Sequence, residues 1–316
     1  MDASLILVRA VSRDTRCVMV KVRFGIHLPS RSTTDFHAIV SYARRCEDLG
    51  FDSVWVADHI LSAESGGLYE PLTTLSILSG STDEIHLGTS VLIASLRNPV
   101  LLADITGTLQ KASDGRLILG VGTGWDQHEF KSLGVSFEDR GAMTDECLAI
   151  MHGLWKGEAF TFEGKHFSVK DIKIGTPPAR SPPVWIGGNS HAAIRRAAGY
   201  NAWFPTDPTT EEISRGRSEL TKRVKTGNMP MVAAHIYLIA EDTTAEAERS
   251  AVFLSEQTGE TVSEVKEWAI VGDVETAKER ISNYVNAGVQ YFSFSLPYVK
   301  NYEASLDRVS QLISQV

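Results

Sequence analysis

Residues 183–196 read Pro-Val-Trp-Ile-Gly-Gly-Asn-Ser-His-Ala-Ala-Ile-Arg-Arg, and we expect the fold to be built around the turn in this stretch. The apolar run at its start predicts a buried strand, and the alanine-rich segment after it predicts a helix. Gly187 and Gly188 allow a sharp turn between them, and Asn189 or Ser190 can cap the helix. Unpaired N–H groups at a helix start bind anions, so the loop is a candidate phosphate site. A plain tight turn explains the same residues.

The same order of strand, turn and helix recurs along the chain. Apolar runs predict strands at residues 22–28, 53–57, 86–93, 116–121, 184–186, 202–204, 232–239 and 291–296. Helical periodicity between them ends in a closing helix over residues 302–313. Eight such units predict an α/β protein, a single-domain TIM (β/α)8 barrel with insertions. A doubly wound sheet is the competitor, but it normally has fewer units and a Gly-x-Gly-x-x-Gly turn after its first strand, which this chain lacks.

Three segments stand outside this regular pattern. Residues 159–169 predict a β-hairpin, and residues 258–270 predict an insertion with a short helix. Both are candidate walls over the carboxyl ends of the barrel strands. Residues 1–20 do not resemble a signal peptide, and we expect a disordered leader or an upstream start there, with the barrel domain over residues 21–316.

Size and composition limit the classes of function. The 316 residues carry a net charge of −8, which argues against nonspecific binding to nucleic acid or to a membrane surface. No apolar run approaches the roughly 20 residues of a membrane span. The three cysteines form no Cys-x-x-Cys pattern, so we expect neither a disulfide framework nor a zinc site, and a cytoplasmic location.

In a barrel of this class the active site lies at the carboxyl ends of the strands, so the polar residues there are the candidates. Asp58 and His59 end the second strand, where a histidine can move a proton or simply cap a loop. Ser90 interrupts the third strand, which predicts a bulge beside a ligand or a plain kink. His27 ends the first strand.

Glycines 120, 122 and 124 are expected to keep one side of the fourth strand's end clear. Trp125, which follows them, predicts either a flat pocket wall or a packing tryptophan.

Two kinds of chemistry lack their residues in this sequence. The nine histidines show no His-x-His or His-x-x-x-His spacing, so a metal site is disfavoured. There is no Gly-x-Ser-x-Gly elbow for a nucleophilic serine. Hydrolysis by either route is therefore not expected.

Four motifs together resemble one known family. They are Leu-Gly-Phe-Asp-Ser-Val-Trp-Val-Ala-Asp-His at residues 49–59, Gly-Val-Gly-Thr-Gly-Trp at residues 120–125, Ile-Gly-Gly at residues 186–188 and Trp-Phe-Pro at residues 203–205. In this order and spacing they resemble the luciferase-like monooxygenase superfamily of flavin- and deazaflavin-dependent oxidoreductases. The similarity covers residues 22–316.

The resemblance implies a TIM-barrel enzyme, usually a homodimer, that binds FMN or coenzyme F420 and acts on a small molecule. By position, Gly187, Gly188, Asn189 and Ser190 would hold the cofactor phosphate. Ser90 and Val91 match the family's non-prolyl cis peptide behind the ring. His59 would lie beside the reactive face of the ring, next to Asp58.

The Asp-His pair at residues 58–59 looks more like the F420 branch, which implies hydride transfer. An FMN-dependent monooxygenase and a non-catalytic flavin-binding barrel remain the alternatives. The sugar-phosphate dehydrogenase branch carries a glutamate where this chain has Trp125, so that substrate is not expected. Asn201-Ala202 replaces the usual Asp-Gly before Trp203, which removes that carboxylate.

Overall fold

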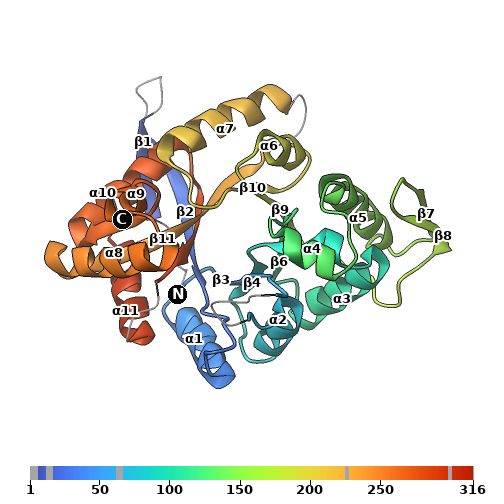
Figure 1. The fold of residues 1–316 in the computed structure, drawn as a ribbon, viewed down its shortest axis with the longest axis horizontal. Coiled ribbons are helices and arrows are strands. Elements are labelled where there is room, and N and C mark those ends of the chain that lie inside the picture. Colours follow the sequence, from blue (N-terminus) through green and yellow to red (C-terminus); the bar gives the residue numbers. More distant parts are fainter. Residues whose placement is uncertain (1–5, 12–16, 62–66, 225–227, 298–300, 316) are drawn as a thin grey trace. The chain divides into compact units, whose positions relative to one another are not determined.

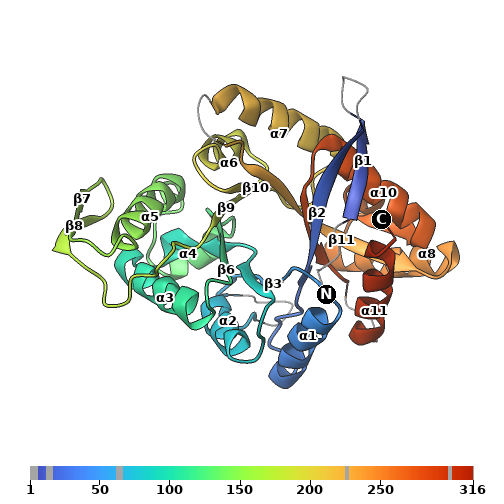
Figure 2. The ribbon, with the colours of Figure 1, turned by 180° about the vertical axis from the view of Figure 1, so that it is seen from behind.

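The computed structural model describes residues 6–11, 17–61, 67–224, 228–297 and 301–315. Contacts divide the chain into two units, which are described separately (Figures 1 and 2). Unit 1 consists of Met1–Leu28, Ser41–Trp55 and Gly188–Val316, and unit 2 consists of Pro29–Val40 and Val56–Gly187. The boundary crosses helix α1 (Phe36–Asp48) and separates Gly187 from Gly188.

Unit 1 is organised on parallel strands with a buried aromatic core. Strand β2 (Cys17–His27) pairs with β3 (Ser53–Val56) and β13 (Tyr291–Ser295), β13 pairs with β11 (Met231–Glu241), and β11 pairs with β10 (Ala202–Phe204). The rings of Phe24, Phe292 and Phe294 stack with centroids 5.3–5.8 Å apart. Its other helices are α6 (His191–Ala197), α7 (Thr210–Arg223), α8 (Thr244–Thr258), α9 (Val262–Trp268), α10 (Val274–Ala287) and α11 (Tyr302–Ile313).

Unit 2 repeats the same plan with shorter strands. Strand β6 (Leu117–Gly122) pairs in parallel with β4 (His86–Thr89), β5 (Leu92–Ile93) and β9 (Val184–Gly187). Its helices are α2 (Pro71–Ser79), α3 (Pro99–Ala112), α4 (Gln127–Ser132) and α5 (Arg140–Leu154), with a short 3-10 turn η1 (Ala94–Leu96). All six residues of β6 are buried, as expected of a strand covered on both faces.

The predicted fold class is confirmed. Each of the eight predicted strands is present, as β2, β3, β4, β6, β9, β10, β11 and β13, and helices separate them in the expected order. The chain therefore has the α/β architecture of the TIM (β/α)8 barrel. The elements that the sequence pattern missed include α4, η1 and strand β12 (Ile270–Asp273), which pairs with β11.

The predicted hairpin is also present. Strands β7 (Phe160–Glu163) and β8 (Ser168–Ile172) pair antiparallel. The carboxylate of Glu146 on α5 accepts hydrogen bonds from the backbone N–H groups of Lys165, His166 and Phe167, at 2.8–2.9 Å. These bonds tie the turn of the hairpin to α5 and lower the pKa of Glu146, although partial burial acts in the opposite direction.

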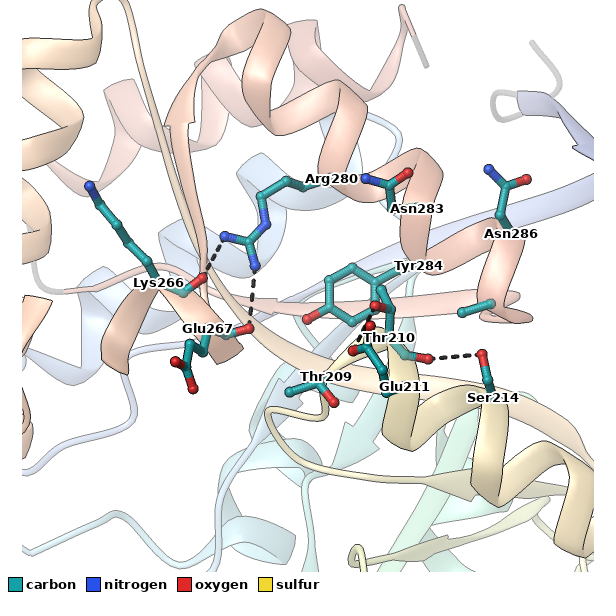
Figure 3. A pocket seen from close by; sticks show the side chains of 11 residues that line it. Thr209, Thr210, Glu211, Ser214, Lys266, Glu267, Arg280, Asn283, Tyr284 and Asn286 are labelled. Carbon is teal, nitrogen blue, oxygen red and sulfur yellow. Dashed lines mark hydrogen bonds between the residues drawn. The ribbon is translucent and has the colours of Figure 1, made fainter. Parts of the chain in front are cut away.

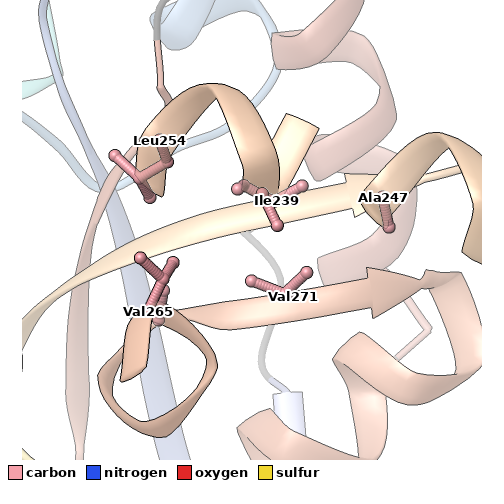
Figure 4. Close-up of a cluster of buried hydrophobic side chains, with 7 residues drawn as sticks. Ile239, Ala247, Leu254, Val265 and Val271 are labelled. Carbon is pink, nitrogen blue, oxygen red and sulfur yellow. The ribbon is translucent and has the colours of Figure 1, made fainter. Parts of the chain in front are cut away.

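The second insertion contains the short helix that the sequence predicts. Helix α9 lies within residues 258–270 and packs with α8 over β11 and β12. Ile239, Ala247, Leu254, Val265 and Val271 form the buried cluster between them (Figure 4). The insertion contributes Val265 and Ala269 to this cluster and is held by it against α8, β11 and β12.

The first residues differ from the expectation of a disordered leader. Residues Ile6–Val11 form strand β1, which pairs antiparallel with the first part of β2, from Ile6 opposite Val22 to Val11 opposite Cys17. Backbone hydrogen bonds to β2 give this segment its order. Among the described residues, no helix combines the length and apolar character that a membrane crossing requires.

Candidate active site

Asp58 follows β3 and its carboxylate is buried and fully engaged. The Arg97 guanidinium donates to both carboxylate oxygens, Nη1 to Oδ2 at 2.5 Å and Nη2 to Oδ1 at 3.0 Å. The Ile93 backbone N–H also donates to Oδ2, at 2.9 Å. Asp58 therefore ties the end of β3 to the segment that follows Ser90 and Val91. Both carboxylate oxygens already have partners within the protein. The expected catalytic role of Asp58 stays a prediction.

His59 lies between a buried carboxylate and an exposed indole. Its Nδ1 is 3.2 Å from Oε2 of Glu129, a residue of α4 whose side chain has no exposed surface. The Trp125 ring meets the imidazole edge-on, with centroids 5.2 Å apart. Trp125 is 73% exposed, so it is no core tryptophan. The structure thus brings together His59 and Trp125, both predicted as site residues, and adds Glu129.

The segment at Ser90 and Val91 has the geometry that the resemblance implies. The Ser90–Val91 peptide bond is cis. The Ser90 N–H donates to the carbonyl of Val56, and the Thr89 hydroxyl donates to the carbonyl of Gly120. These bonds fix the segment between the ends of β3 and β6.

The glycines around this segment serve a different purpose from the one predicted. A Cβ on Gly122 would lie 2.5 Å from Cγ2 of Val91, and one on Gly187 would lie 2.7 Å from Cγ1 of Val91. A Cβ on Gly120 would lie 2.0 Å from the Thr89 carbonyl oxygen. The expectation that glycines keep this strand end clear was therefore wrong, because residues 89–91 occupy the space themselves.

In unit 1, the loop after β9 is held by hydrogen bonds to the segment after β10. The Asn189 side chain exchanges two hydrogen bonds with the Thr206 backbone, at 2.8 and 3.0 Å. The Trp203 indole N–H donates to the carbonyl of Gly188, which has φ +113°. Ser190 caps α6 by accepting from the Ala193 N–H. The Asn189 side chain is thus bonded within the loop, whereas the Ser190 hydroxyl only accepts and keeps its own O–H donor, so an anion here could bind this hydroxyl as well as backbone N–H groups.

His27 ends β2, as predicted, and it meets a residue that sequence reasoning missed. Its ring lies edge-on to that of His235 on β11, with centroids 5.1 Å apart. Burial and the neighbouring His27 hold the pKa of His235 well below its usual range. The Tyr302 hydroxyl donates to the His27 carbonyl. His235 is therefore a neutral hydrogen-bonding group beside His27 at neutral pH.

Asp207 follows β10 in a conformation that few side chains adopt. Its φ is +46°, and its Oδ1 is inaccessible to water with no hydrogen-bond partner. Burial, with a smaller contribution from the charge of Glu260, raises the pKa of Asp207 to about 7. The Tyr237 backbone N–H acts in the opposite direction. Unit 1 therefore holds a carboxyl group that titrates near neutral pH.

A cavity of unit 1 is lined by other residues. It is an open groove of about 940 Å³ between the first turns of α7, the end of α9 and α10 (Figure 3). The Arg280 guanidinium donates to the backbone carbonyls of Lys266 and Glu267 at one side of it. Its lining carries charges of both signs and includes none of the predicted site residues. In the described part of the chain, no three His, Cys, Asp or Glu residues are grouped to hold a metal ion.

Comparison with known proteins identifies the family. Residues 18–265 match the family described as "Luciferase-like monooxygenase". The chain belongs to this family.

The chain is similar in sequence to the protein named "F420-dependent glucose-6-phosphate dehydrogenase" from Amycolatopsis mediterranei (strain U-32). It is 27% identical over 293 residues, which cover 82% of this chain and 88% of that protein.

Solved structures of luciferase-like and related proteins share the fold at lower identity. An F420-dependent secondary alcohol dehydrogenase in complex with an F420–acetone adduct superimposes with a TM-score of 0.80 and 20% identity, covering 92% of this chain and 98% of that one. The oxygenating constituent of 3,6-diketocamphane monooxygenase from Pseudomonas putida, in complex with FMN, gives 0.74 and 18%, covering 94% and 96%. The luciferase-like fold thus occurs with either cofactor.

Three site residues of this luciferase-like chain carried little sequence signal. Arg97 lies 39 positions from Asp58 with no local motif to join them. Glu129 is an acidic residue four positions after Trp125, which could have predicted a helix start but not a contact with His59. His235 lies within an apolar strand, where a histidine predicts only a satisfied core position.

Proposed function

We propose that the chain is a coenzyme F420-dependent oxidoreductase that transfers a hydride between the deazaflavin and a small organic substrate. The observation that carries the proposal is the contact between His59 and Trp125 in unit 2, which follow β3 and β6, with Val91 packed against Gly122 of β6. The family, and relatives named as F420-dependent dehydrogenases, support the choice of cofactor.

The residues present fit a planar ring system. The Trp125 indole is flat and 73% exposed, and the imidazole of His59 lies at its edge. The Val91 side chain, packed against Gly122 and Gly187, offers an apolar surface fixed by its neighbours. A deazaflavin supplies a ring carbon that carries a hydride.

We further propose that Gly187, Gly188, Asn189 and Ser190 hold the cofactor phosphate. The donors would be backbone N–H groups at the start of α6 together with the Ser190 hydroxyl, which accepts the cap bond and can still donate. Amides held in place by side-chain hydrogen bonds need little reorganisation when they bind an anion.

The side chains then have distinct tasks. His59 takes or gives the proton of the substrate's reacting group, since an imidazole nitrogen can either accept or donate a proton. Asp58 and Arg97 fix the segment after Val91. Trp125 of unit 2 is proposed to contact the substrate, because an indole surface favours an apolar or aromatic face there. The role of His27 of unit 1 as a substrate-pocket residue is a separate proposal.

We do not propose that this chain shares the substrate of the named relatives. Trp125 stands where the sugar-phosphate dehydrogenase branch carries a glutamate, so we propose a substrate without a phosphorylated sugar. An FMN-dependent monooxygenase has the same fold, and its chemistry is therefore an outcome of the test.

The test is a substrate screen monitored by the deazaflavin's visible absorbance, which is lost when F420 takes up a hydride and regained when reduced F420 gives one up. The purified chain is mixed with F420 and a panel of small alcohols, or with reduced F420 and the matching carbonyl compounds and enones, with and without oxygen. Turnover that is independent of oxygen supports the proposal. Product formation that needs oxygen and reduced FMN contradicts it, and tight cofactor binding without any turnover favours a binding protein.

We also propose a cytoplasmic homodimer. Among the described residues, Cys46 and Cys147 are free and buried, in keeping with a reducing compartment. The mass of the purified chain in solution tests the dimer, and a monomer at micromolar concentration contradicts it.

A further inference from the structure

We infer that Glu129 is a positioning residue that holds His59 with its proton on Nδ1 and so leaves Nε2 as the basic nitrogen of the neutral ring. The geometry stands by itself, whereas the consequence for turnover rests on the proposed function of His59.

The carboxylate of Glu129 is held in place by a hydrogen bond from the backbone at Leu61. Asp126 precedes helix α4 and caps its start, because its side chain accepts a hydrogen bond from the His128 N–H. The side chain of Glu129 projects from its first turn into the interior, where it has no exposed surface. Its Oε1 accepts a hydrogen bond from the Leu61 backbone N–H at 3.0 Å. A backbone amide can only donate, so this bond fixes which oxygen faces Leu61.

The other oxygen then dictates the tautomer of His59. Oε2 lies 3.2 Å from Nδ1 of His59. An ionised carboxylate can only accept, so the neutral ring must carry its proton on Nδ1 to make this bond. The lone pair is thereby left on Nε2. Trp125 meets the His59 ring edge-on, with ring centroids 5.2 Å apart, and this contact also restricts the orientation of the imidazole.

This arrangement serves proton transfer better than a free histidine would. The side chain of His59 is 27% exposed, so one part of the ring reaches the surface while Nδ1 is bound to an inaccessible carboxylate. A ring of fixed orientation and tautomer presents the same nitrogen at every encounter. A purely structural role for Glu129, joining Leu61 to α4, would leave the ring's tautomer unaffected.

Glu129→Gln separates the two roles. The Leu61 N–H still needs an acceptor, so the glutamine carbonyl must face Leu61 and its NH2 group must face Nδ1 of His59. A donor in that position requires Nδ1 to accept, which moves the proton to Nε2. The substitution keeps the size and the Leu61 contact, yet it reverses the tautomer.

The first measurement needs no cofactor and no substrate. Nitrogen-15 NMR of the imidazole, at a pH where the ring is neutral, reports which nitrogen carries the proton, and the His59 signals are assigned by their loss in His59→Gln. We expect Nδ1–H in the wild type, Nε2–H in Glu129→Gln and no change in Glu163→Gln, an exposed acidic residue of β7. Nε2–H in the wild type, or the same tautomer in the wild type and Glu129→Gln, overturns the inference.

The second measurement tests whether Glu129 acts through His59. We expect Glu129→Gln to lower kcat by about 10- to 100-fold in the wild-type background and by less than about twofold in His59→Ala. Equal losses in both backgrounds overturn the positioning role. If Glu129→Gln does not fold, Glu129→Asp and the wild-type tautomer decide instead, because the shorter side chain cannot reach both partners. Failure to find any turnover contradicts the proposed function and leaves the tautomer result standing.

Discussion

Arg97 binds Asp58 through two parallel hydrogen bonds, at 2.5 and 3.0 Å, and the carboxylate it binds is only 1% exposed. The same guanidinium also reaches Glu70, the N-cap of α2, at 3.0 Å. One arginine thus joins the end of β3, the segment after Val91 and the start of α2. We expect this arginine to be a main source of order around the candidate site of unit 2.

Arg97→Met should strongly destabilise the protein. The substitution leaves the buried Asp58 carboxylate without its counter-charge, which typically costs about 3–5 kcal/mol in the free energy of unfolding. Chemical denaturation measures the loss. Arg249→Met is the control, since Arg249 is 71% exposed and lies 4.0 Å from its partner Glu246, so it should change stability by less than about 0.5 kcal/mol. A similar loss in both variants would rule out a special role for the buried pair.

His59→Ala should slow turnover by about 10²- to 10⁴-fold while the cofactor dissociation constant changes only a few-fold. The reason is that the imidazole is proposed to move a proton in the reaction, which contributes little to binding. His128→Ala, an exposed histidine one position before Glu129, is the matched control and should turn over normally. Unchanged turnover in His59→Ala would remove His59 from the mechanism.

Gly187→Ala should cost about 1–3 kcal/mol of stability, because its Cβ would meet the Val91 side chain at 2.7 Å. Adding Val91→Ala removes the atoms that clash, so the double variant should lose less than the sum of the two single changes. Gly175→Ala is the control, as nothing lies within 4 Å of its Cβ position. Strict additivity would show that Val91 is not what requires a glycine at position 187.

Asp207→Asn should change how stability depends on pH. Burial raises the pKa of Asp207 in the folded protein to about 7, above its usual value of 3.8. Between these values the folded state holds a proton that the unfolded state has lost, so stability falls as pH rises from about 4 to about 7 and is constant above. Asparagine removes this loss and tolerates the positive φ.

The free energies of unfolding of wild type and Asp207→Asn, measured at pH 5 and pH 8, test this reasoning. The difference should move in favour of the variant by at least ~1 kcal/mol at the higher pH. Parallel pH profiles would mean that the Asp207 carboxyl is ionised in the folded protein at both values.

Most of the fold could be predicted from the sequence because each strand is a short apolar run bounded by turn residues. Helix α11 begins and ends where the periodicity predicts, at residues 302–313. Helix α4 was missed because its six residues are too few to show a period. Strand β1 was missed because its order comes from pairing with β2, which no local pattern reveals.

The candidate site could be predicted only in part. The cis peptide at Ser90–Val91 is present as the resemblance implies, and the predicted site residues His59 and Trp125 contact each other. Their partners could not be found, since Arg97 and Glu129 meet Asp58 and His59 through space and across 39 and 70 positions of sequence. The glycines at 120, 122 and 187 were recognised, but only the folded chain reveals their neighbours, the Thr89 carbonyl for Gly120 and the Val91 side chain for Gly122 and Gly187.

The most direct test of the proposed redox function is an equilibrium fluorescence titration of the purified chain with coenzyme F420 and, separately, with FMN. We predict saturable one-to-one binding of F420 at least tenfold tighter than that of FMN. Tighter binding of FMN, or saturation by neither cofactor, would contradict the assignment of this chain as an F420-dependent oxidoreductase.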